Sequence, residues 1–355
     1  MIDAPTRRDA ADTYHSQRLK DHADAYARLK SDITEAGILR RSYPFYYSMI
    51  LFSFAGYALS LWALFAWDAY LSLLVACLGV SFFTVQLAGL MHDAGHRAAF
   101  ASKRANNWLG IATTAAIGMV FVNWTERHNR HHARPNQEGA DPDMEVPFLA
   151  LTEANYSTKD AAQRFTVRWQ AYYYYPLGAL VGFSNRLGSI SFFLRNRTRA
   201  NLARFALYVP AMVVLFAGPF IVFPLDKAVF VFFVVHVTTG VYLASCFAPN
   251  HKGMRTFPID AEVSFLEQQA ATARNVSGGL LTDLFLVGLN HQIEHHLFPT
   301  CPRNKLRQLG SHVRRACAEQ GIDYSEVSFL RTNQTLVKHL HGISRMSGGA
   351  IGTGA

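Results

Sequence analysis

The chain has 355 residues, of which half are hydrophobic and only 17% are charged, whereas soluble domains carry about 25% charged residues. Because the apolar residues gather in long uncharged runs, the sequence predicts an integral membrane protein rather than two soluble domains. A net charge of +9 without a zinc-finger spacing or another nucleic-acid motif argues against a nucleic-acid partner. It favours contact with anionic lipid headgroups or an acidic electron-carrier protein.

Two apolar runs follow a polar N-terminal arm. Residues 1–44 mix both signs of charge and lack the apolar core of a secretory signal, so we expect a cytosolic arm. The runs at about 45–67 and 69–91 contain no charged residue, and each is long enough to cross a bilayer core of about 30 Å as a helix. Because only Asp68 separates them, the two runs predict a helical hairpin.

The middle of the chain predicts further membrane contacts. Trp108–Trp124 is uncharged but short and contains glycines, which favours a buried or re-entrant helix. The aromatic stretch Trp169–Phe193 favours interfacial helices, because Tyr and Trp gather at the headgroup level. Two more uncharged runs, at about 205–225 and 228–249, predict a second hairpin.

The distribution of Lys and Arg predicts the orientation. Of the 34 Lys and Arg residues, only Lys227 falls within a predicted span or hairpin turn. The positive-inside rule therefore places both termini in the cytoplasm. We expect a membrane domain over 45–310 and a cytosolic C-terminal segment with a flexible tail over 311–355. The predicted fold is all-α, with four spans in two hairpins, interfacial or re-entrant helices and a cytosolic cap.

Three histidine clusters fall on this cytosolic side. Residues three or four apart share one face of a helix, so the members of each cluster are expected to point together. Imidazole is a common ligand of iron, zinc, copper and nickel. Three clusters hold more nitrogen than one four-coordinate zinc uses, so the cap is predicted to carry a di-metal site. The clusters are His92 and His96; His128, His131 and His132; and His291, Gln292, His295 and His296.

One rival motif overlaps the third cluster. His291, Glu294 and His295 match the His-x-x-Glu-His pattern of zinc metalloproteases, in which Glu is the general base. This interpretation leaves the first two clusters without a role, and we keep it as a remote alternative.

The order and spacing of the clusters resemble the membrane fatty acid desaturases of the acyl-lipid and acyl-CoA types. The segments Asn129–Asn136, Asp141–Asp143, Asn250–Met254 and His291–Pro299 are similar to that family, and the resemblance covers about residues 40–310. It implies a non-haem di-iron enzyme that uses O2 to make a C=C double bond in a fatty acyl lipid or acyl-CoA. A di-iron hydroxylase on the same scaffold is the alternative, and the Gln-type third box favours a bond toward the carboxyl end.

The resemblance also implies a set of iron ligands. The boxes supply His92, His96, His128, His131, His132, His295 and His296, and the family often has a further His at the cytosolic end of the fourth span. His251 fits that position better than His236, which lies in mid-span. At the third box Gln292 fits the family register, while adjacent His291 is the stronger ligand type. Carboxylates that would orient the imidazoles are Asp93, Asp141, Asp143 and Glu294.

The electron donor is expected to be a separate protein. Some family members carry a fused cytochrome b5 domain with a His-Pro-Gly-Gly motif, which this sequence does not contain. The resemblance therefore implies a ferredoxin or a free cytochrome b5-like protein that docks on the basic cytosolic face.

Overall fold

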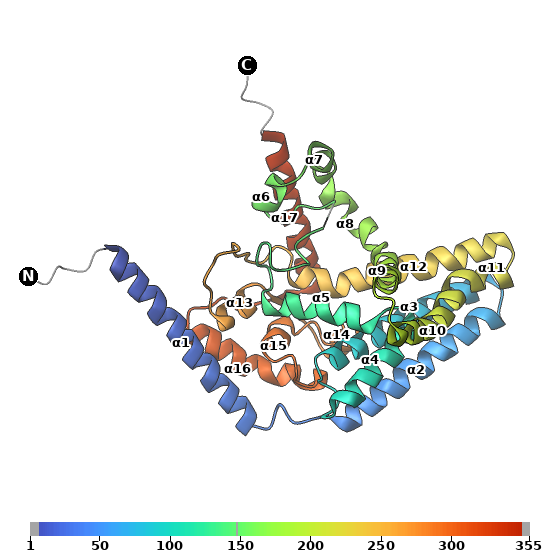
Figure 1. Cartoon of the computed structure of the whole chain (residues 1–355), viewed down its shortest axis with the longest axis horizontal. Coiled ribbons are helices and arrows are strands. Elements are labelled where there is room, and N and C mark those ends of the chain that lie inside the picture. The colour runs from blue at the N-terminus through green and yellow to red at the C-terminus, as the bar shows by residue number, and fades with distance from the viewer. Residues whose placement is uncertain (1–6, 147, 350–355) are drawn as a thin grey trace, which may run out of the picture.

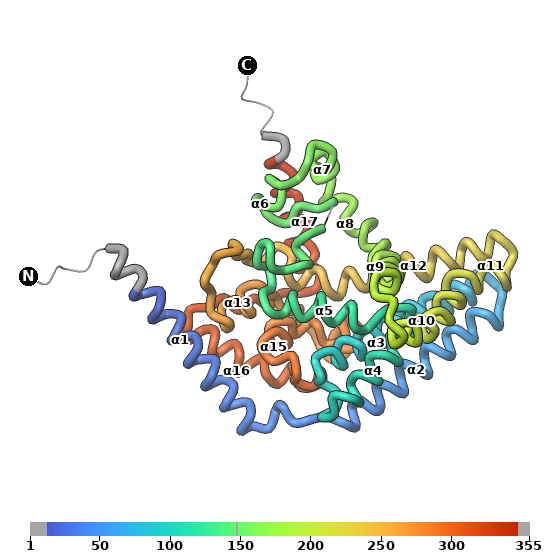
Figure 2. The backbone as a smooth tube through the Cα atoms, viewed as in Figure 1, coloured from blue at the N-terminus to red at the C-terminus, as the bar shows by residue number. Residues whose placement is uncertain are grey.

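The computed structural model, which describes residues 7–146 and 148–349, is a bundle of membrane-length helices joined to a helical cap (Figures 1 and 2). The first hairpin consists of α2 (Tyr43–Ala66) and α3 (Tyr70–Gly95). The second pairs a broken helix, Arg199–Val222, with α12 (Leu225–Phe247). All four helices are long and apolar enough to cross a membrane, which confirms the four predicted spans.

The third span begins earlier than the sequence suggested and is not uniform. It is built from α10 (Arg199–Met212), one π-helical turn η1 (Val213–Ala217) and α11 (Gly218–Val222). Pro210 and Pro219 each lack a backbone N–H, so regular α-helical hydrogen bonding cannot run unbroken through this segment.

Two bent helix pairs lie against these hairpins. α4 (Lys103–Ile117) and α5 (Phe121–Ala133) meet at 111°, and this pair contains the re-entrant helix expected at Trp108–Trp124. Gly118 allows the bend, because its φ of +71° is a left-handed conformation that side chains disfavour. α8 (Gln170–Gly178) and α9 (Val181–Arg195) meet at 64°, forming a broken span or re-entrant loop where interfacial helices were expected.

The cap combines both ends of the chain (Figure 1). Leu29 and Ile33 of α1 (Arg7–Glu35) share a core with Ile293, Leu309 and Val313. The remaining cap elements are η2 (Ala248–Asn250), α13 (Phe265–Ala271), β1 (Arg274–Ser277), α14 (Leu280–Phe285), α15 (Gln292–Leu297), η3 (Arg303–Lys305), α16 (Leu306–Glu319), β2 (Ser325–Ser328) and α17 (Phe329–Gly349), with α6 (Glu153–Ser157) and α7 (Ala161–Val167) beside α17.

A small parallel sheet was not predicted. β1 pairs with β2 in register from Arg274 opposite Ser325 to Ser277 opposite Ser328. Strands of four residues are too short to leave a clear two-residue period in the sequence. The boundaries predicted at residues 44 and 310 stay predictions, and the expected C-terminal tail falls largely on residues 350–355, outside the described residues.

Candidate metal centre

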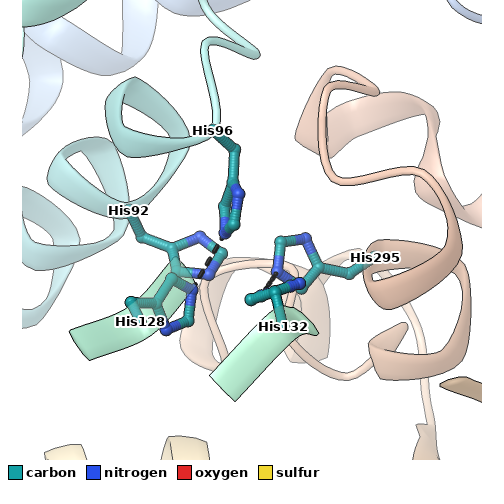
Figure 3. Close-up of side chains that lie close together, drawn as sticks. All are labelled: His92, His96, His128, His132 and His295. Atoms are coloured by element: carbon teal, nitrogen blue, oxygen red, sulfur yellow. Dashed lines mark hydrogen bonds between the residues drawn. The ribbon is translucent and has the colours of Figure 1, made fainter. Parts of the chain in front are cut away.

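Five histidines converge from three helices to form the first histidine group. His92 and His96 lie at the end of α3, His128 and His132 on α5, and His295 on α15. One ligand nitrogen from each lies within 4.8 Å of all the others (Figure 3). The four-residue spacing of each helical pair explains why both of its rings face inward. The structure therefore brings together parts of all three sequence clusters.

Three histidines form the second histidine group, again within 4.8 Å of one another: His131, His251 and His296. The amide of Gln292 lies beside them, with its Nε2 2.9 Å from His251 Nε2. The ring centroids of His132 and His296 are only 4.1 Å apart, so the two groups adjoin.

The expectation that each sequence cluster points together is wrong for adjacent histidines. His132 belongs to the first group and His131 to the second, and His295 and His296 divide in the same way. Neighbouring residues on an α-helix are about 100° apart around its axis, since a turn takes 3.6 residues. Each adjacent pair therefore serves both groups rather than one.

The second group is held in one orientation by hydrogen bonds on its outer side. Nδ1 of His131 donates to Asp141 at 2.9 Å, and Nδ1 of His251 to the carbonyl of Thr272 at 3.0 Å. Nδ1 of His296 donates to the Oε1 of Gln269, also at 2.9 Å. This arrangement leaves each Nε2 as the inward-facing lone pair, which is how proteins prepare imidazole for a metal.

Burial favours the neutral form of three histidines in the two groups. It lowers the pKa values of His251, His295 and His296 well below the ordinary value, and neighbouring rings lower them further by charge repulsion. Neutral imidazole is the form that binds metals. Burial alone would raise the pKa of Asp141, but the hydrogen bond to His131 outweighs it and lowers the pKa to about 2.

The inward nitrogens fit metal ions. Within the described chain, His92 Nε2 and His296 Nε2 are buried without a hydrogen-bond partner. Others face a like atom, as His96 Nε2 does at 2.9 Å from His128 Nε2. Buried polar atoms left without partners are costly. Cations bound between these nitrogens would satisfy them, and an all-imidazole donor set suits iron or another transition metal.

The predicted orienting carboxylates have different surroundings. Asp93 lies 3.5 Å from His92 Nδ1 and pairs with buried Arg303 at 2.8 Å. Asp143 lies 3.9 Å from His131 and binds the exposed Arg127. Glu294 has no histidine partner among its hydrogen bonds, since it accepts from Asn275 and Tyr324 instead.

His291 and His236 lie outside both groups. His291 Nε2 is 3.0 Å from Asp283, on the other side of the third cluster. His236 lies among the rings of Phe183, Phe216 and Phe232, with centroids 4.4–4.8 Å away. The structure thus does not join His291 with His295 in one histidine group, as the zinc-protease pattern requires.

Several contacts in the site were not predicted from the sequence. Gln269 binds His296 through its oxygen and the His132 carbonyl through its nitrogen, at 2.9 and 3.0 Å. Trp124 stacks on His128 with centroids 4.4 Å apart. Gln269 lies far from every histidine cluster in the sequence, so only the fold could reveal it, whereas Trp124 precedes His128 by four residues on α5 and shares its helical face.

An apolar pocket of about 500 Å³ opens beside the second group. His131 and His251 contribute to its wall, and Arg127 and Lys252 line it as well. Most of the remaining lining comes from apolar residues of α8, α9, α12 and the segment before α6, among them Val146, Leu149, Leu177, Val181, Leu243 and Phe247. A long apolar ligand in this pocket would lie against two histidines of the second group.

The sequence matches a known family model. The model described as fatty acid desaturase aligns with residues 66–328. This range contains every member of both histidine groups.

Individual relatives are similar over most of the chain. The "Delta(8)-fatty-acid desaturase" of Euglena gracilis is 29% identical, over 67% of this chain and 60% of its own length. The "Delta 8-(E)-sphingolipid desaturase" of Kluyveromyces lactis is also 29% identical, over 92% of this chain and 60% of its own. The "Acyl-lipid (9-3)-desaturase" of Borago officinalis is 26% identical, over 89% and 73%. The chain thus spans about 60% of the length of the first two relatives.

Proposed function

The chain belongs to the fatty acid desaturase family, and we propose that it introduces a C=C double bond into a fatty acyl chain, using O2 at a non-haem di-iron centre. The observation that carries the proposal is the convergence of two buried histidine groups beside an apolar pocket. In this proposal His92, His96, His128, His132 and His295 hold one iron ion. His131, His251, His296 and Gln292 hold the other.

The protein's own residues prepare the site for this reaction. When bound, the iron ions would supply the oxidising power: O2 receives two hydrogens from neighbouring carbons of the acyl chain, together with two electrons from the donor protein and two protons, and leaves as two water molecules. Asp141, Thr272 and Gln269 hold the outer nitrogens of their histidines, which fixes the tautomers. The apolar pocket orients the acyl chain and excludes water from the reacting carbons.

The proposal extends to orientation and electron supply. Both termini and the histidine groups face the cytoplasm, supported by the near absence of Lys and Arg from spans and turns. Electrons come from a separate ferredoxin or cytochrome b5-like protein. The exposed side chains of Arg127, Arg130 and Arg134, next to the second group, support an acidic partner docking there. The new double bond is placed toward the carboxyl end of the acyl chain.

Metal content and product analysis test the proposal together. We expect about two iron ions per purified chain. Cells expressing the protein should contain a new unsaturated acyl species. Each of His96→Ala, His131→Ala and His295→Ala should abolish the product while membrane insertion is kept, and the exposed His15→Ala should retain it.

Other outcomes would point elsewhere. A hydroxylated product with normal iron content would favour the hydroxylase. One zinc ion per chain and no iron, even after attempted iron reconstitution, would favour the zinc metalloprotease. Normal product yield from two of the three histidine variants would contradict the ligand assignment.

A further inference from the structure

A second cavity, which we call the polar groove, lies between α5 and α9. It has a volume of about 620 Å³, and its walls include Asn123, Arg127, Ser184, Asn185, Ser191 and Arg195. Both helices belong to the bent pairs that are long and apolar enough to enter a membrane. A groove rich in amide, hydroxyl and guanidinium groups is unexpected between such segments, because polar groups inside a membrane are costly without a partner.

The polar side chains of the groove have unused hydrogen-bonding capacity. Over the described part of the chain, the side chains of Asn123, Ser184, Asn185 and Ser191 form no hydrogen bond with the protein. Ser189 on the same helix differs, since its hydroxyl accepts from the Val120 N–H and donates to a carbonyl. The four open side chains can therefore bind a ligand without breaking an existing contact.

The charge of the groove favours an anion. Arg127 and Arg195 line it against a single carboxylate, Glu126. Arg127 is already paired with Asp143 at 2.8 Å, whereas Arg195 forms no ion pair with any described residue. A guanidinium is suited to bidentate recognition of phosphate.

The groove adjoins the apolar pocket beside the second histidine group. Arg127 and Ser184 line both cavities. On α5, Arg127 precedes His131 by four residues, or about 6 Å along the helix. A ligand that places a polar group in the groove can extend an apolar chain past the histidines. The geometry suits an amphiphile with a short distance between its headgroup and the reacting carbons.

The location of Arg195 favours a membrane lipid over a soluble thioester. The span that begins at Arg199 follows directly, so Arg195 lies near the level of the lipid headgroups. A phospholipid offers a single phosphodiester beside neutral ester and hydroxyl oxygens, which matches one free arginine among amides and hydroxyls. Coenzyme A carries several phosphates and an adenine, for which the groove provides too few cations.

We propose that the polar groove binds the phosphodiester headgroup of a membrane phospholipid whose acyl chain enters the apolar pocket. This inference rests on the proposed desaturase function and specifies the carrier of its substrate. Arg195 binds the phosphate, and Asn185 and Ser191 bind neighbouring headgroup oxygens.

A lipid-binding measurement that does not depend on turnover tests this inference. The full chain in detergent micelles is titrated with a fluorescent phosphatidylcholine, and unlabelled phosphatidylcholine and an acyl-CoA of the same acyl chain serve as competitors. Arg195→Gln should weaken binding about tenfold, the value of one charged hydrogen bond to phosphate, and Asn185→Ala should weaken it less. Arg199→Gln is the matched control, with the same charge change outside the groove, and should leave binding unchanged.

The outcomes distinguish this inference from the proposed function. Wild-type affinity in both groove variants would overturn the groove assignment, even if the wild-type protein desaturates lipids. Displacement by acyl-CoA that is lost in Arg195→Gln would overturn the choice of phospholipid. Selective loss of phosphatidylcholine binding would support the groove, even if no double bond forms and the proposed function fails. Arg195 is exposed, so matched thermal unfolding is expected for its variant.

Discussion

The Asp141 carboxylate accepts three hydrogen bonds beside the second histidine group. It accepts from the N–H of Asn136 and of Asp143, both at 2.8 Å, as well as from His131. These donors stabilise the ionised form and hold its position. Asp141 therefore fixes both the direction and the tautomer of the His131 ring.

Asp141→Asn should weaken metal binding without removing a ligand. A neutral amide cannot replace the carboxylate as an acceptor of all three N–H groups, so His131 should lose its fixed orientation. Loss of such an orienting partner typically costs ten- to a hundredfold in metal affinity. The loss of metal affinity is measured as the iron retained per chain after incubation with increasing concentrations of a chelator. Asp143→Asn, at a more exposed carboxylate, is the control, and equal iron retention in the two variants would contradict the assignment.

A second, half-buried acid, Asp283, gives a pH-dependent contribution to stability. Burial raises the pKa of Asp283, but hydrogen bonds from His291, Arg307 and Asn290 outweigh it and lower the pKa from 3.8 to about 2. A depressed pKa means that the stabilisation is present above pH 4 and is lost as the pH falls toward 2.

Asp283→Asn should therefore lower the melting temperature at pH 6, and the difference from the wild type should shrink as the pH falls below 4. Thermal unfolding at several pH values measures both proteins in parallel. Asp260→Asn changes an acid without such bonds and should show a constant, small difference. A difference for Asp283→Asn that grows on acidification would contradict this account.

The sequence could predict which histidines form the site but not how they divide. The spacing of His92 and His96, or of His128 and His132, fixes a shared helical face. Helix geometry implies that His131 and His132 diverge, but which histidines each of them meets depends on where α3, α15 and the segment after α12 lie around α5, and spacing within one helix cannot show that. The roles of Gln269 and Thr272 likewise depend on contacts between segments far apart in sequence.

At the scale of elements, α12 packs closely against the α8–α9 bend. A Cβ on Gly240 would lie 2.3 Å from the Ala179 carbonyl oxygen. Small residues allow such close approach of helices in membranes. Residues on both sides of this contact, among them Leu177, Val181 and Leu243, line the apolar pocket, so the contact also sets its width.

Gly240→Ala should force the two backbones apart and destabilise the protein by about 1–3 kcal/mol. Thermal unfolding in detergent measures the loss, and substrate affinity should fall with it because the pocket wall moves. Gly342→Ala is the matched control, since nothing lies within 4 Å of its added Cβ. Equal stability of the two variants would show that the close contact is not required.

The two bent helix pairs show which helices can be predicted from apolar runs in the sequence and which cannot. Length and composition identified the four long spans, because a helix that crosses lipid must be apolar over its whole length. They could not separate an interfacial helix from the bent pair α8–α9, since both are aromatic and of intermediate length. The close approach of Gly240 to Ala179 at this bend involves a different helix, α12, which the composition of residues 170–195 cannot show.

At the scale of the whole molecule, the two hairpin turns are tied together. Lys227 binds Asp68 at 3.1 Å, and the Tyr70 hydroxyl donates to Asp226 at 2.6 Å. These contacts place both turns at one end of the bundle, opposite the cap that holds the histidines (Figure 1). One labelling experiment can therefore determine the orientation of both hairpins.

The native cysteines make this experiment simple, because Cys77, Cys246, Cys301 and Cys317 are all buried. A membrane-impermeant thiol reagent should label Ala69→Cys in intact cells, as this turn is expected outside the cytoplasm. Lys20→Cys on α1 should react only after lysis. The reverse pattern would show that the histidine groups face away from the cytoplasm.

The parallel strand pair makes completion of the cap a late step in protein synthesis. Asn275 lies within β1. Its side chain accepts a hydrogen bond from the Ile293 N–H and donates one to Glu294, so β1 positions the third histidine cluster. Its partner β2 begins only at Ser325. A nascent chain on the ribosome therefore contains every member of both histidine groups before the strand that steadies them has emerged, and we expect metal loading to follow release of the finished chain.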